Sequence, residues 1–573
     1  MPTEYPCVVA IDFGTTYSGY AFSTRNDYKS DPLRVVSSTW AGTRLISLKA
    51  PSCILFRPDR KFDSFGFEAE DKYMELTMDN EHNQWYFFKR FKMSLYNSKD
   101  VHRTTEIHDE TKKPMRAMEV FASAIQYLKD HAMDCINRRV MHLHEEDVRW
   151  VLTVPAIWDD AAKQFMREAA VKSGIPDKHL VLSLEPEAAS MFCKYLPVEL
   201  LMNTQSGKIS CFQPGSKYLV LDAGGGTVDI TVHEVLKNGK LKELHKVNGG
   251  AWGGTTVDKA FIDFIEKLTV NLPLSEYMDN NKEDFMDMMR EFEIKKRSAT
   301  PNMDSKITFK IPISLFEWYS RNKQMELREA IKGNQSLSGK VVLAGDKMRV
   351  DCKVVESFFD KTCSEIVAHM KNIFSEPMAK EISAILMVGG FSESAMLQDA
   401  VKKAFPTKRV IIPNEAGLAV LKGAVLFGHD SSVITARIAK YTYGLKTRPT
   451  YDPKIHPKER LDKSGKRIQG VFSKLVEVGQ STSVEDRQEK RSYFPLHGGT
   501  AFTIKLYASP EKNPEYVDDP SCFRVGEVIV DCRNRDGSIG SASVWLVFGG
   551  TELEVHAENK CGEKTQASFD FLE

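Results

Sequence analysis

Apolar runs of strand length alternate with helix-length segments through the first 428 residues. The run VRWVLTVPA at 148–156 is typical of a buried strand that a proline closes. The segment after it has helix punctuation, with Asp159 or Asp160 as the N-cap and Gly174 just past the end. Similar strand-then-helix units recur along this part of the chain. The pattern predicts an α/β fold up to about residue 428.

After residue 441 the spacing changes and helix signals nearly vanish. Four segments alternate apolar and polar residues at a period of two, and clusters of Gly, Pro, Asn and Asp separate them. These segments are AFTIKLYAS, GEVIVDC, ASVWLVF and TELEVHAE. We expect an antiparallel β-sandwich over 441–573, a linker at 429–440, and no helical lid.

One supersecondary unit occurs twice. The apolar strand 8–11 ends in Asp-Phe-Gly-Thr-Thr and is followed at once by a second strand, 19–23; residues 218–235, YLVLDAGGGTVDITVHEV, repeat the arrangement. A repeat over such a long period indicates duplicated lobes rather than a solenoid. We therefore expect lobe I at about 5–215 and 389–428, and lobe II at about 216–388.

Composition excludes several classes of protein. The 573 residues are 42% hydrophobic and 27% charged, and 78 Lys and Arg balance 78 Asp and Glu, so no net positive field attracts nucleic acid. Ten cysteines contain no C-x-x-C pair, the N-terminus has no signal-peptide pattern, and no apolar run could span a membrane. We expect a soluble, reduced intracellular protein, cytoplasmic with access to the nucleus.

The two turns of the repeat carry residues suited to phosphate. Backbone N–H groups of a tight glycine and threonine turn can surround phosphate oxygens. Asp12 and Asp222, each at a strand end, could face each other across a cleft and hold Mg²⁺ through water. A pair of ordinary hairpin turns is the alternative. The remaining turn residues are Gly14, Thr15 and Thr16, then Gly224, Gly225, Gly226 and Thr227.

Other phosphate-binding or nucleophile motifs are missing from the sequence. Neither G-x-x-x-x-G-K-[ST], G-x-G-x-x-G nor G-x-S-x-G occurs. P-loop, Rossmann and α/β-hydrolase readings therefore have no support.

The ordered motifs AIDFGTTYSGYAF, VLTVPAIWDDAAKQFMREAA, LVLSLEPEAAS, YLVLDAGGGTVDITV, EFEIKKRSA and LMVGGFSES resemble those of the actin-like ATPase superfamily. They are most similar to the seventy-kilodalton heat-shock chaperones. The variants FGTTYSGYAF, AWGGTTVD, VGGFSES and EAGLAVLKGAV resemble the divergent heat shock 70 kDa protein 12 branch. The resemblance covers about 7–428 through specific motifs and 441–573 only loosely.

The resemblance implies catalytic roles for Lys89, Glu185, Asp222 and Thr227. Lys89 in FFKRF would reach the γ-phosphate, and Glu185 would orient the attacking water. Asp229 would be a further carboxylate of the second lobe. Alternatively, Lys89 is an ordinary surface lysine and Glu185 a helix-starting glutamate.

For the nucleoside, Glu293, Lys296 and Arg297 fall on one helix face at i, i+3 and i+4. Such a trio is also common as a solvated salt-bridge ladder. The resemblance implies that it binds ribose and the base. The family has an arginine where this chain has Phe391 and Ser392, so an aromatic face could replace half of the adenine clamp. The other residues that we expect near the nucleotide are Tyr17, Gly389 and Gly390.

The resemblance implies a chaperone-like protein that binds Mg²⁺ with ATP or ADP, hydrolyses ATP slowly, and controls a β domain holding a protein client. Co-chaperones are expected partners. A nucleotide-dependent scaffold with little ATPase activity stays open, because Glu393, Thr255 and the linker depart from the family pattern. An actin-fold small-molecule kinase also stays open, although the C-terminal β domain argues against it.

Overall fold

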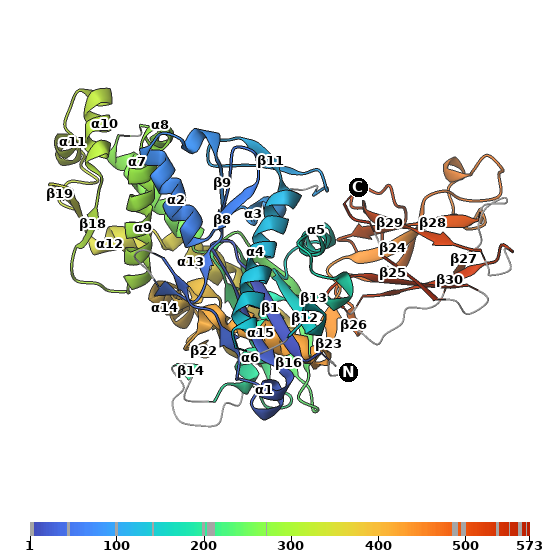
Figure 1. Ribbon diagram of the computed structural model, residues 1–573. Helices are drawn as coiled ribbons and strands as arrows, with labels where there is room; N and C mark the ends of the chain where they lie inside the picture. Colours follow the sequence, from blue (N-terminus) through green and yellow to red (C-terminus); the bar gives the residue numbers. More distant parts are fainter. Residues whose placement is uncertain are drawn as a thin grey trace.

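The protein consists of two α/β lobes and a C-terminal β domain (Figure 1). The computed structural model describes residues 5–42, 46–97, 101–139, 143–197, 201–202, 212–270, 272–483, 491–493, 500–533, 538–548, 550–559, 564–568 and 570–572.

Lobe I is built on a mixed sheet with strand order β13-β12-β1-β2-β3. β1 pairs antiparallel with β2 and parallel with β12, which in turn pairs parallel with β13. A short strand, β6, extends β2 beside the first glycine and threonine turn. The strands are β1 (Cys7–Phe13), β2 (Tyr17–Thr24), β3 (Val36–Ser37), β6 (Ala50–Pro51), β12 (Val148–Val154) and β13 (Leu180–Leu184).

Lobe II repeats this arrangement. Its sheet has the order β14-β22-β21-β15-β16-β17-β23-β26, in which β15-β16 is the antiparallel hairpin and β21 and β22 are the parallel neighbours. The sequence pattern assigns residues 389–428 to lobe I, but β22 pairs with β21 and therefore lies in the sheet of lobe II. The strands are β14 (Leu201–Met202), β15 (Lys217–Ala223), β16 (Val228–Val235), β17 (Leu241–Gly250), β21 (Ile382–Val388), β22 (Arg409–Pro413), β23 (Ile434–Ile438) and β26 (Ser481–Ser483).

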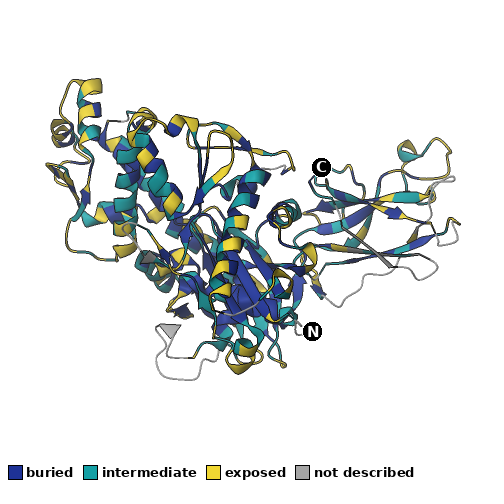
Figure 2. Ribbon diagram, viewed as in Figure 1, coloured by how far each residue is buried: buried dark blue, intermediate teal, exposed yellow. Residues whose placement is uncertain are grey.

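Two helices, α6 (Glu185–Tyr195) and α15 (Ala419–His429), lie between the sheets. Because successive side chains of a strand point to opposite faces, Val8 and Ala10 of β1 and Tyr218 and Val220 of β15 join this shared layer. The alternate residues of the two strands face separate cores under the outer helices. Buried positions therefore fill the middle of both lobes (Figure 2).

The outer helices cover the far faces of the sheets. On lobe I these are α4 (Ala117–Asn137) and α5 (Asp160–Lys172), and α5 begins at an N-cap, Asp159, whose side chain accepts from the N–H of Ala162 at 2.8 Å. The helices of lobe II are α7 (Thr255–Leu268), α8 (Leu274–Asn280), α9 (Lys282–Ser298), α10 (Ile313–Lys323), α11 (Leu327–Gly333), α12 (Cys352–Ser357), α13 (Asp360–Ser375) and α14 (Ala395–Ala404).

Smaller elements bring the tops of the lobes together. In lobe I, α2 (Phe67–Met78) rests on the sheet β8-β7-β9 and also lies against α9 of lobe II (Figure 1). Arg290 of α9 is 3.2 Å from a carboxylate oxygen of both Glu70 and Asp71 of α2. The remaining elements are α1 (Arg25–Ser30), α3 (Met93–Asn97), β4 (Trp40–Ala41), β5 (Ile46–Ser47), β7 (Cys53–Phe56), β8 (Phe62–Phe65), β9 (Tyr86–Lys89), β10 (Glu106–His108), β11 (Pro114–Arg116), β18 (Ile307–Lys310), β19 (Val341–Ala344) and β20 (Lys347–Val350).

The C-terminal domain contains two four-stranded antiparallel sheets, β25-β24-β28-β29 and β27-β30-β31-β32. Apolar residues of both sheets, among them Leu506 and Leu546, belong to one buried core. The strands are β24 (Thr442–Thr447), β25 (Val471–Val476), β27 (Arg491–Tyr493), β28 (Ala501–Ser509), β29 (Phe523–Asp531), β30 (Ala542–Val547), β31 (Glu554–Asn559) and β32 (Lys564–Ser568).

The segment expected to be a linker, 429–440, contains β23, which pairs parallel with β17 of lobe II. Arg437 of β23 donates two hydrogen bonds of 2.7 Å to Glu187 of α6, and both side chains are buried. At the end of the segment, Lys440 donates to the carbonyl of Ile157 at 2.7 Å. The segment is thus part of the lobe II sheet rather than a free tether.

The β domain packs against α5 of lobe I (Figure 1). Arg167 of α5 forms two hydrogen bonds with the Glu552 carboxylate, at 2.6 and 2.5 Å, and Lys163 donates to the carbonyl of Thr551 at 3.3 Å. Leu572 is buried in the apolar core of lobe I, and Arg103 binds Asp570 at 2.9 Å. The domain is therefore held on lobe I by ion pairs as well as apolar contact.

Candidate functional site

Four carboxylates from different elements meet where the two lobes face each other. Asp12 lies at the end of β1, Asp222 at the end of β15, Asp229 at the start of β16, and Glu185 in the first turn of α6. The three aspartates are almost fully buried. The related strand order of the lobes explains why two strand ends far apart in sequence come together.

Two lysines neutralise two of these carboxylates. The Lys49 ammonium lies 2.6 Å from Asp12 Oδ2, while Thr153 Oγ1 donates to Asp12 Oδ1 at 2.8 Å. The Lys92 ammonium donates to Glu185 Oε1 at 2.7 Å and lies 5.2 Å from the centre of the Trp158 ring. The Lys92 side chain is only 3% exposed, so its charge acts inside the protein.

The other two carboxylates have no cation of their own among the described residues. Burial, and then the charges of Glu185 and Asp229, raise the pKa of Asp222 well above its usual range, and Asp222 Oδ2 has no hydrogen-bond partner in the described structure. Burial raises the pKa of Asp229 to about 7, although its Oδ1 accepts from the N–H of Ile157 at 2.8 Å. This half of the cluster is electrostatically suited to a cation.

Asp12 and Glu185 behave differently. Burial opposes ionisation of Asp12, but the charge and hydrogen bond of Lys49 outweigh it and lower the pKa of Asp12. Burial raises the pKa of Glu185 despite its contact with Lys92. The two strand-end aspartates, equivalent in the sequence pattern, are therefore chemically distinct.

The turns next to these aspartates expose N–H groups. In the first turn, two carbonyl oxygens accept hydrogen bonds from Ser52. Its Oγ donates to the carbonyl of Gly14 at 2.6 Å, and its N–H donates to the carbonyl of Thr16 at 2.9 Å. Within the described residues, the N–H groups of Thr15 and Thr16 donate to no protein acceptor. The turn therefore presents donors and hides acceptors, as an anion site requires.

The second turn has the same polarity. The carbonyls of Gly224, Gly225 and Gly226 accept from the three N–H groups of residues 253–255, which lead into α7. In the described part of the chain, the N–H groups of Gly225, Gly226 and Thr227 have no protein acceptor.

The two turns face each other closely. A Cβ on Gly225 would lie 2.2 Å from Thr16 Oγ1, and one on Gly226 would lie 2.6 Å from Thr15 Oγ1. At Gly389, where φ is +85°, a Cβ would lie 2.4 Å from Asp222 Oδ1. Only glycine allows these approaches, so the glycines of the motif are needed for the closed arrangement of the turns.

The residues expected near a nucleoside come from both lobes. The Arg297 guanidinium is 5.1 Å from the centre of the Tyr17 ring, and Arg297 Nε donates to Glu293 at 2.7 Å. Lys296 binds the buried Asp258 at 2.6 Å. A Cβ at Gly390 would meet no atom within 4 Å, so the backbone there borders open space.

Phe391 and Ser392 have different surroundings. Phe391 is 7% exposed and belongs to the core of lobe II, so its ring is not displayed as an aromatic face. Ser392 Oγ is buried without a hydrogen-bond partner in the described structure. It is the more suitable of the two to bind a polar ligand.

Lys89 and Lys92 have different surroundings in the structure. Lys89 ends β9 and is half-buried, and its ammonium makes no hydrogen bond or ion pair within the described residues. The lysine that contacts Glu185 is Lys92, three positions later. Lys92 and Lys49 are the site residues that sequence reasoning missed; the basic run FFKRFK was the only signal for Lys92, and Lys49 had none.

The donor set restricts how a metal could bind. Among the described residues, no three His, Cys, Asp or Glu side chains are grouped closely enough to hold an ion directly. Mg²⁺ keeps several of its waters in protein sites, so the unpartnered Asp222 oxygen and the nearby carboxylates fit binding through water.

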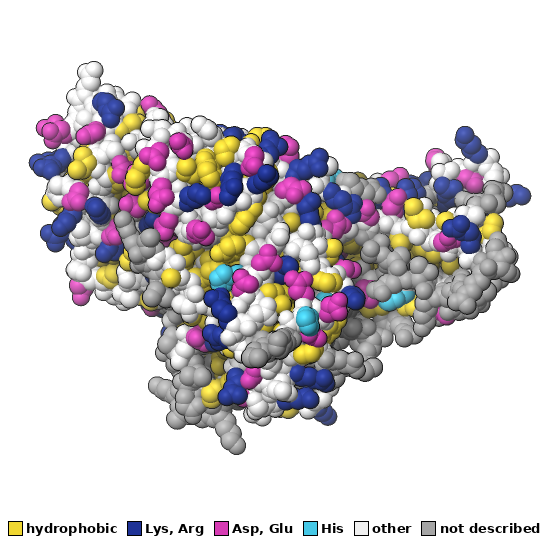
Figure 3. All heavy atoms as spheres, in the orientation of Figure 1, with side chains coloured by type: hydrophobic (Ala, Val, Ile, Leu, Met, Phe, Trp, Pro, Cys, Tyr) yellow, Lys and Arg dark blue, Asp and Glu magenta, His cyan; other side chains and the backbone are white. Residues whose placement is uncertain are grey.

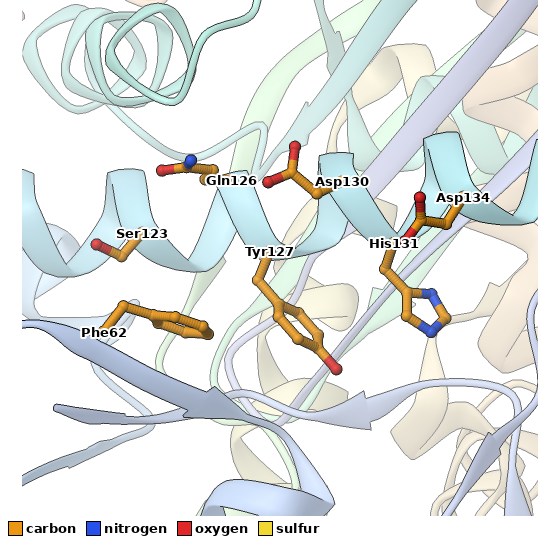
Figure 4. A pocket seen from close by; sticks show the side chains of 7 residues that line it. All are labelled: Phe62, Ser123, Gln126, Tyr127, Asp130, His131 and Asp134. Atoms are coloured by element: carbon orange, nitrogen blue, oxygen red, sulfur yellow. The ribbon is translucent and has the colours of Figure 1, made fainter.

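A separate hollow of about 280 Å³ lies on the outside of lobe I (Figure 4). Six of its seven lining residues come from one face of α4, and Phe62 of β8 closes the other side. Asp130, on its rim, pairs with Lys129 at 3.1 Å. None of its lining residues belongs to the carboxylate cluster.

The surface and the helices give two further observations. On the face in Figure 3, Lys and Arg side chains are interspersed with Asp and Glu, in keeping with the zero formal charge. No helix in the described ranges combines the length and apolar character that a membrane crossing requires.

Comparison with known proteins gives concordant matches. A family model described as Hsp70 protein matches residues 8–458. Heat shock 70 kDa protein 12A of Homo sapiens is 33% identical over 99% of this chain and 91% of that protein, and heat shock 70 kDa protein 12B of Homo sapiens is 32% identical over the same shares. Heat shock 70 kDa protein 6, chloroplastic, of Arabidopsis thaliana is 22% identical over 85% of this chain and 61% of that protein.

Proposed function

The chain belongs to the Hsp70 protein family, and from this we propose that it binds Mg²⁺ with ATP or ADP between its lobes and hydrolyses ATP slowly. One observation carries the proposal. Two turns with unpaired N–H groups, four carboxylates and two ammonium groups converge from both lobes, and one buried oxygen, Asp222 Oδ2, has no partner among the described residues.

In this proposal the N–H groups of the two turns bind the phosphate oxygens. A bound Mg²⁺ would neutralise phosphate charge, and the carboxylates of Asp222 and Asp12 would hold its water shell. Asp12 can take part although both of its oxygens are bonded, because each carboxylate oxygen has a second lone pair. Thr227 adds a hydroxyl next to the second turn.

The remaining polar groups fit roles in hydrolysis. The buried Lys92 ammonium, which Glu185 orients, would stabilise negative charge on the transferred phosphoryl group. Asp229, with a pKa of about 7, can take a proton from water at neutral pH. Lys89, which the sequence predicts to reach the γ-phosphate, would be a second and more exposed cation.

On the nucleoside side, we place the base against Arg297 and Tyr17. The sugar hydroxyls would bind Glu293, Lys296 and Ser392, with Gly389 and Gly390 allowing close approach of the backbone. Open space beside Gly390 and the unpartnered Ser392 Oγ support this placement.

The C-terminal domain is proposed to hold a protein client. Its two sheets around one core support a β-sandwich, and past residue 441 the described residues include only a short 3₁₀ turn, Lys458–Arg460, in place of longer helices. Because the β domain contacts α5 and β23, a movement of the lobes on nucleotide binding would shift the β domain and so change the client site. Co-chaperones would act on the same coupling.

Calorimetric titration of ATP and ADP, with Mg²⁺ present, tests the binding proposal. Wild-type protein should bind both nucleotides, and Asp222→Asn should lower the Mg²⁺-dependent affinity at least tenfold. Asp59→Asn, a change at an exposed carboxylate of lobe I, is the matched control and should have no effect. Absence of binding to the wild type would refute the proposed function.

A nucleotide-dependent scaffold is the second candidate. The observation that favours it is that the Lys92 ammonium is already engaged by Glu185 and Trp158. Single-turnover hydrolysis of bound ATP separates the two. A slow ATPase shows turnover that Lys92→Ala reduces at least a hundredfold and Lys89→Ala reduces less, whereas a scaffold binds ATP without converting it. A screen for phosphoryl transfer to sugars addresses the kinase alternative.

A further inference from the structure

Lys49 is placed in the site by the strand that supports the first turn. It directly precedes β6, which pairs with Tyr17 and Ser18 of β2. Ser52, just after β6, binds the carbonyls of the first turn. The stem of Lys49 runs beside Gly19, where a Cβ would lie 3.1 Å from Lys49 Cγ. The same short segment thus orients the turn and directs the ammonium to Asp12.

The contact with Lys49 gives Asp12 a neighbouring positive charge that Asp222 lacks. Asp12 Oδ2 has an ammonium at 2.6 Å and Oδ1 a hydroxyl at 2.8 Å, whereas Asp222 Oδ2 has no partner among the described residues. The Lys49 side chain is 15% exposed, so it is less screened than a surface lysine. Lys49 directly precedes the strand that pairs with Tyr17 and Ser18, and these two residues follow Thr15 and Thr16, whose N–H groups have no acceptor in the described structure.

We propose that Lys49 is a further phosphate-binding residue of the nucleotide site, a cation built into the chain beside Asp12. Its ammonium binds oxygens of the diphosphate or triphosphate, next to the divalent ion whose water shell Asp12 and Asp222 would hold. The proposal rests on the nucleotide-binding function proposed above. It implies that part of the affinity for polyphosphate persists when divalent ions are removed.

The test compares variants in which Asp12 is already neutral. Lys49→Met alone would leave a buried aspartate without its counter-ion and could unfold the lobe. Asp12→Asn keeps an oxygen that can accept from Thr153 and removes that difficulty. Asp12→Asn and the double variant Asp12→Asn/Lys49→Met are therefore titrated calorimetrically with ADP and with pyrophosphate, both in EDTA and in Mg²⁺.

In EDTA we expect the double variant to bind ADP and pyrophosphate about tenfold more weakly than Asp12→Asn, as loss of one charge-assisted hydrogen bond predicts. Mg²⁺ should improve the affinity of the double variant by a larger factor than that of Asp12→Asn. Asp12→Asn/Lys61→Met, which changes an exposed lysine of the same lobe, should match Asp12→Asn.

Equal affinities of Asp12→Asn and the double variant in EDTA would overturn the role of Lys49 and leave nucleotide binding intact. The same holds if the control Asp12→Asn/Lys61→Met weakens binding as much as the double variant, since the loss would then be nonspecific. A wild type that binds neither ADP nor pyrophosphate in Mg²⁺ overturns the proposed function, and this inference with it.

Discussion

At the scale of single residues, Glu243 of β17 illustrates a buried carboxylate outside the four-carboxylate cluster. Its Oε2 accepts from the N–H of Ile438 at 2.9 Å, and its Oε1 has no partner in the described structure. Burial raises the pKa of Glu243 to about 8, with Glu187 adding to the rise and Arg437 and Lys163 opposing it. A neutral Glu243 thus secures the strand that leads to the β domain.

We predict a pH-dependent effect of Glu243→Gln. The folded state keeps the proton up to about pH 8, whereas an unfolded glutamate loses it near its ordinary pKa, so this group makes the free energy of unfolding fall as pH rises between those values. Glutamine keeps the acceptor for Ile438 without the charge. The variant should match wild type at pH 5 and be more stable at pH 9, by roughly 1–3 kcal/mol. Denaturant unfolding at both pH values measures this, and equal stability at pH 9 would contradict it.

The candidate site could be predicted from sequence where the signal is local. Asp12 and Asp222 stand at strand ends before glycine turns, a pattern visible in a few residues, and the structure brings both to one place. Lys49 could not be predicted, because it enters from a different segment and only the strand pairing of β6 directs it to Asp12. Phe391, expected as an aromatic face, lies in the core of lobe II, where its ring is next to Gly254, the residue before α7.

At the scale of elements, the close crossing of α6 and α15 matters most for the site. A Cβ on Gly423 of α15 would lie 1.7 Å from the carbonyl oxygen of Ala188 on α6. The first turn of α6 carries Glu185, which holds Lys92, and Glu187, which holds Arg437. The position of this helix therefore affects both the carboxylate cluster and β23.

We predict that Gly423→Ala destabilises the protein by about 2 kcal/mol or more, because two helix backbones must separate to admit the methyl group. Gly333→Ala is the control, since a Cβ there meets no atom within 4 Å. Chemical denaturation of both variants measures the difference. If the two variants proved equally stable, the close crossing would not be a constraint.

Elements with local punctuation were predictable, and those with distant partners were not. The helix α5 begins at Asp159, one of the two N-caps that the sequence predicts, and the period-two segment 501–509 is β28. By contrast, β23 lies in the segment expected to be a linker, because its pairing partner β17 is almost two hundred residues away and leaves no mark in the sequence around it. The assignment of β22 to lobe II depends in the same way on a distant pairing.

At the scale of the whole molecule, the β domain and lobe I share a surface. Arg167 and Glu552 form its central ion pair, and Leu572 is buried in the apolar core of lobe I. In the described structure the two lobes pack through the shared helix layer, and the β domain packs on lobe I through this surface. Separation of the β domain must expose Leu572 and break these ion pairs.

We predict that Leu572→Asp releases the β domain, because a charged group is strongly disfavoured in an apolar core. The radius of gyration from small-angle X-ray scattering should increase, and protease cleavage near residue 440 should accelerate. Ile455→Asp, at a residue of the same domain that is 71% exposed, is the control and should change neither. An unchanged radius for Leu572→Asp would mean that the ion pairs suffice to hold the domain.

Ile157 uses its two backbone polar groups in opposite directions: its N–H donates to Asp229, and its carbonyl accepts from Lys440. One residue therefore touches both the carboxylate cluster and the segment that enters the β domain. In a sample labelled with ¹⁵N at isoleucine, its amide resonance would serve as an internal spectroscopic probe, because ligand arrival at Asp229 and withdrawal of Lys440 would each alter its magnetic environment.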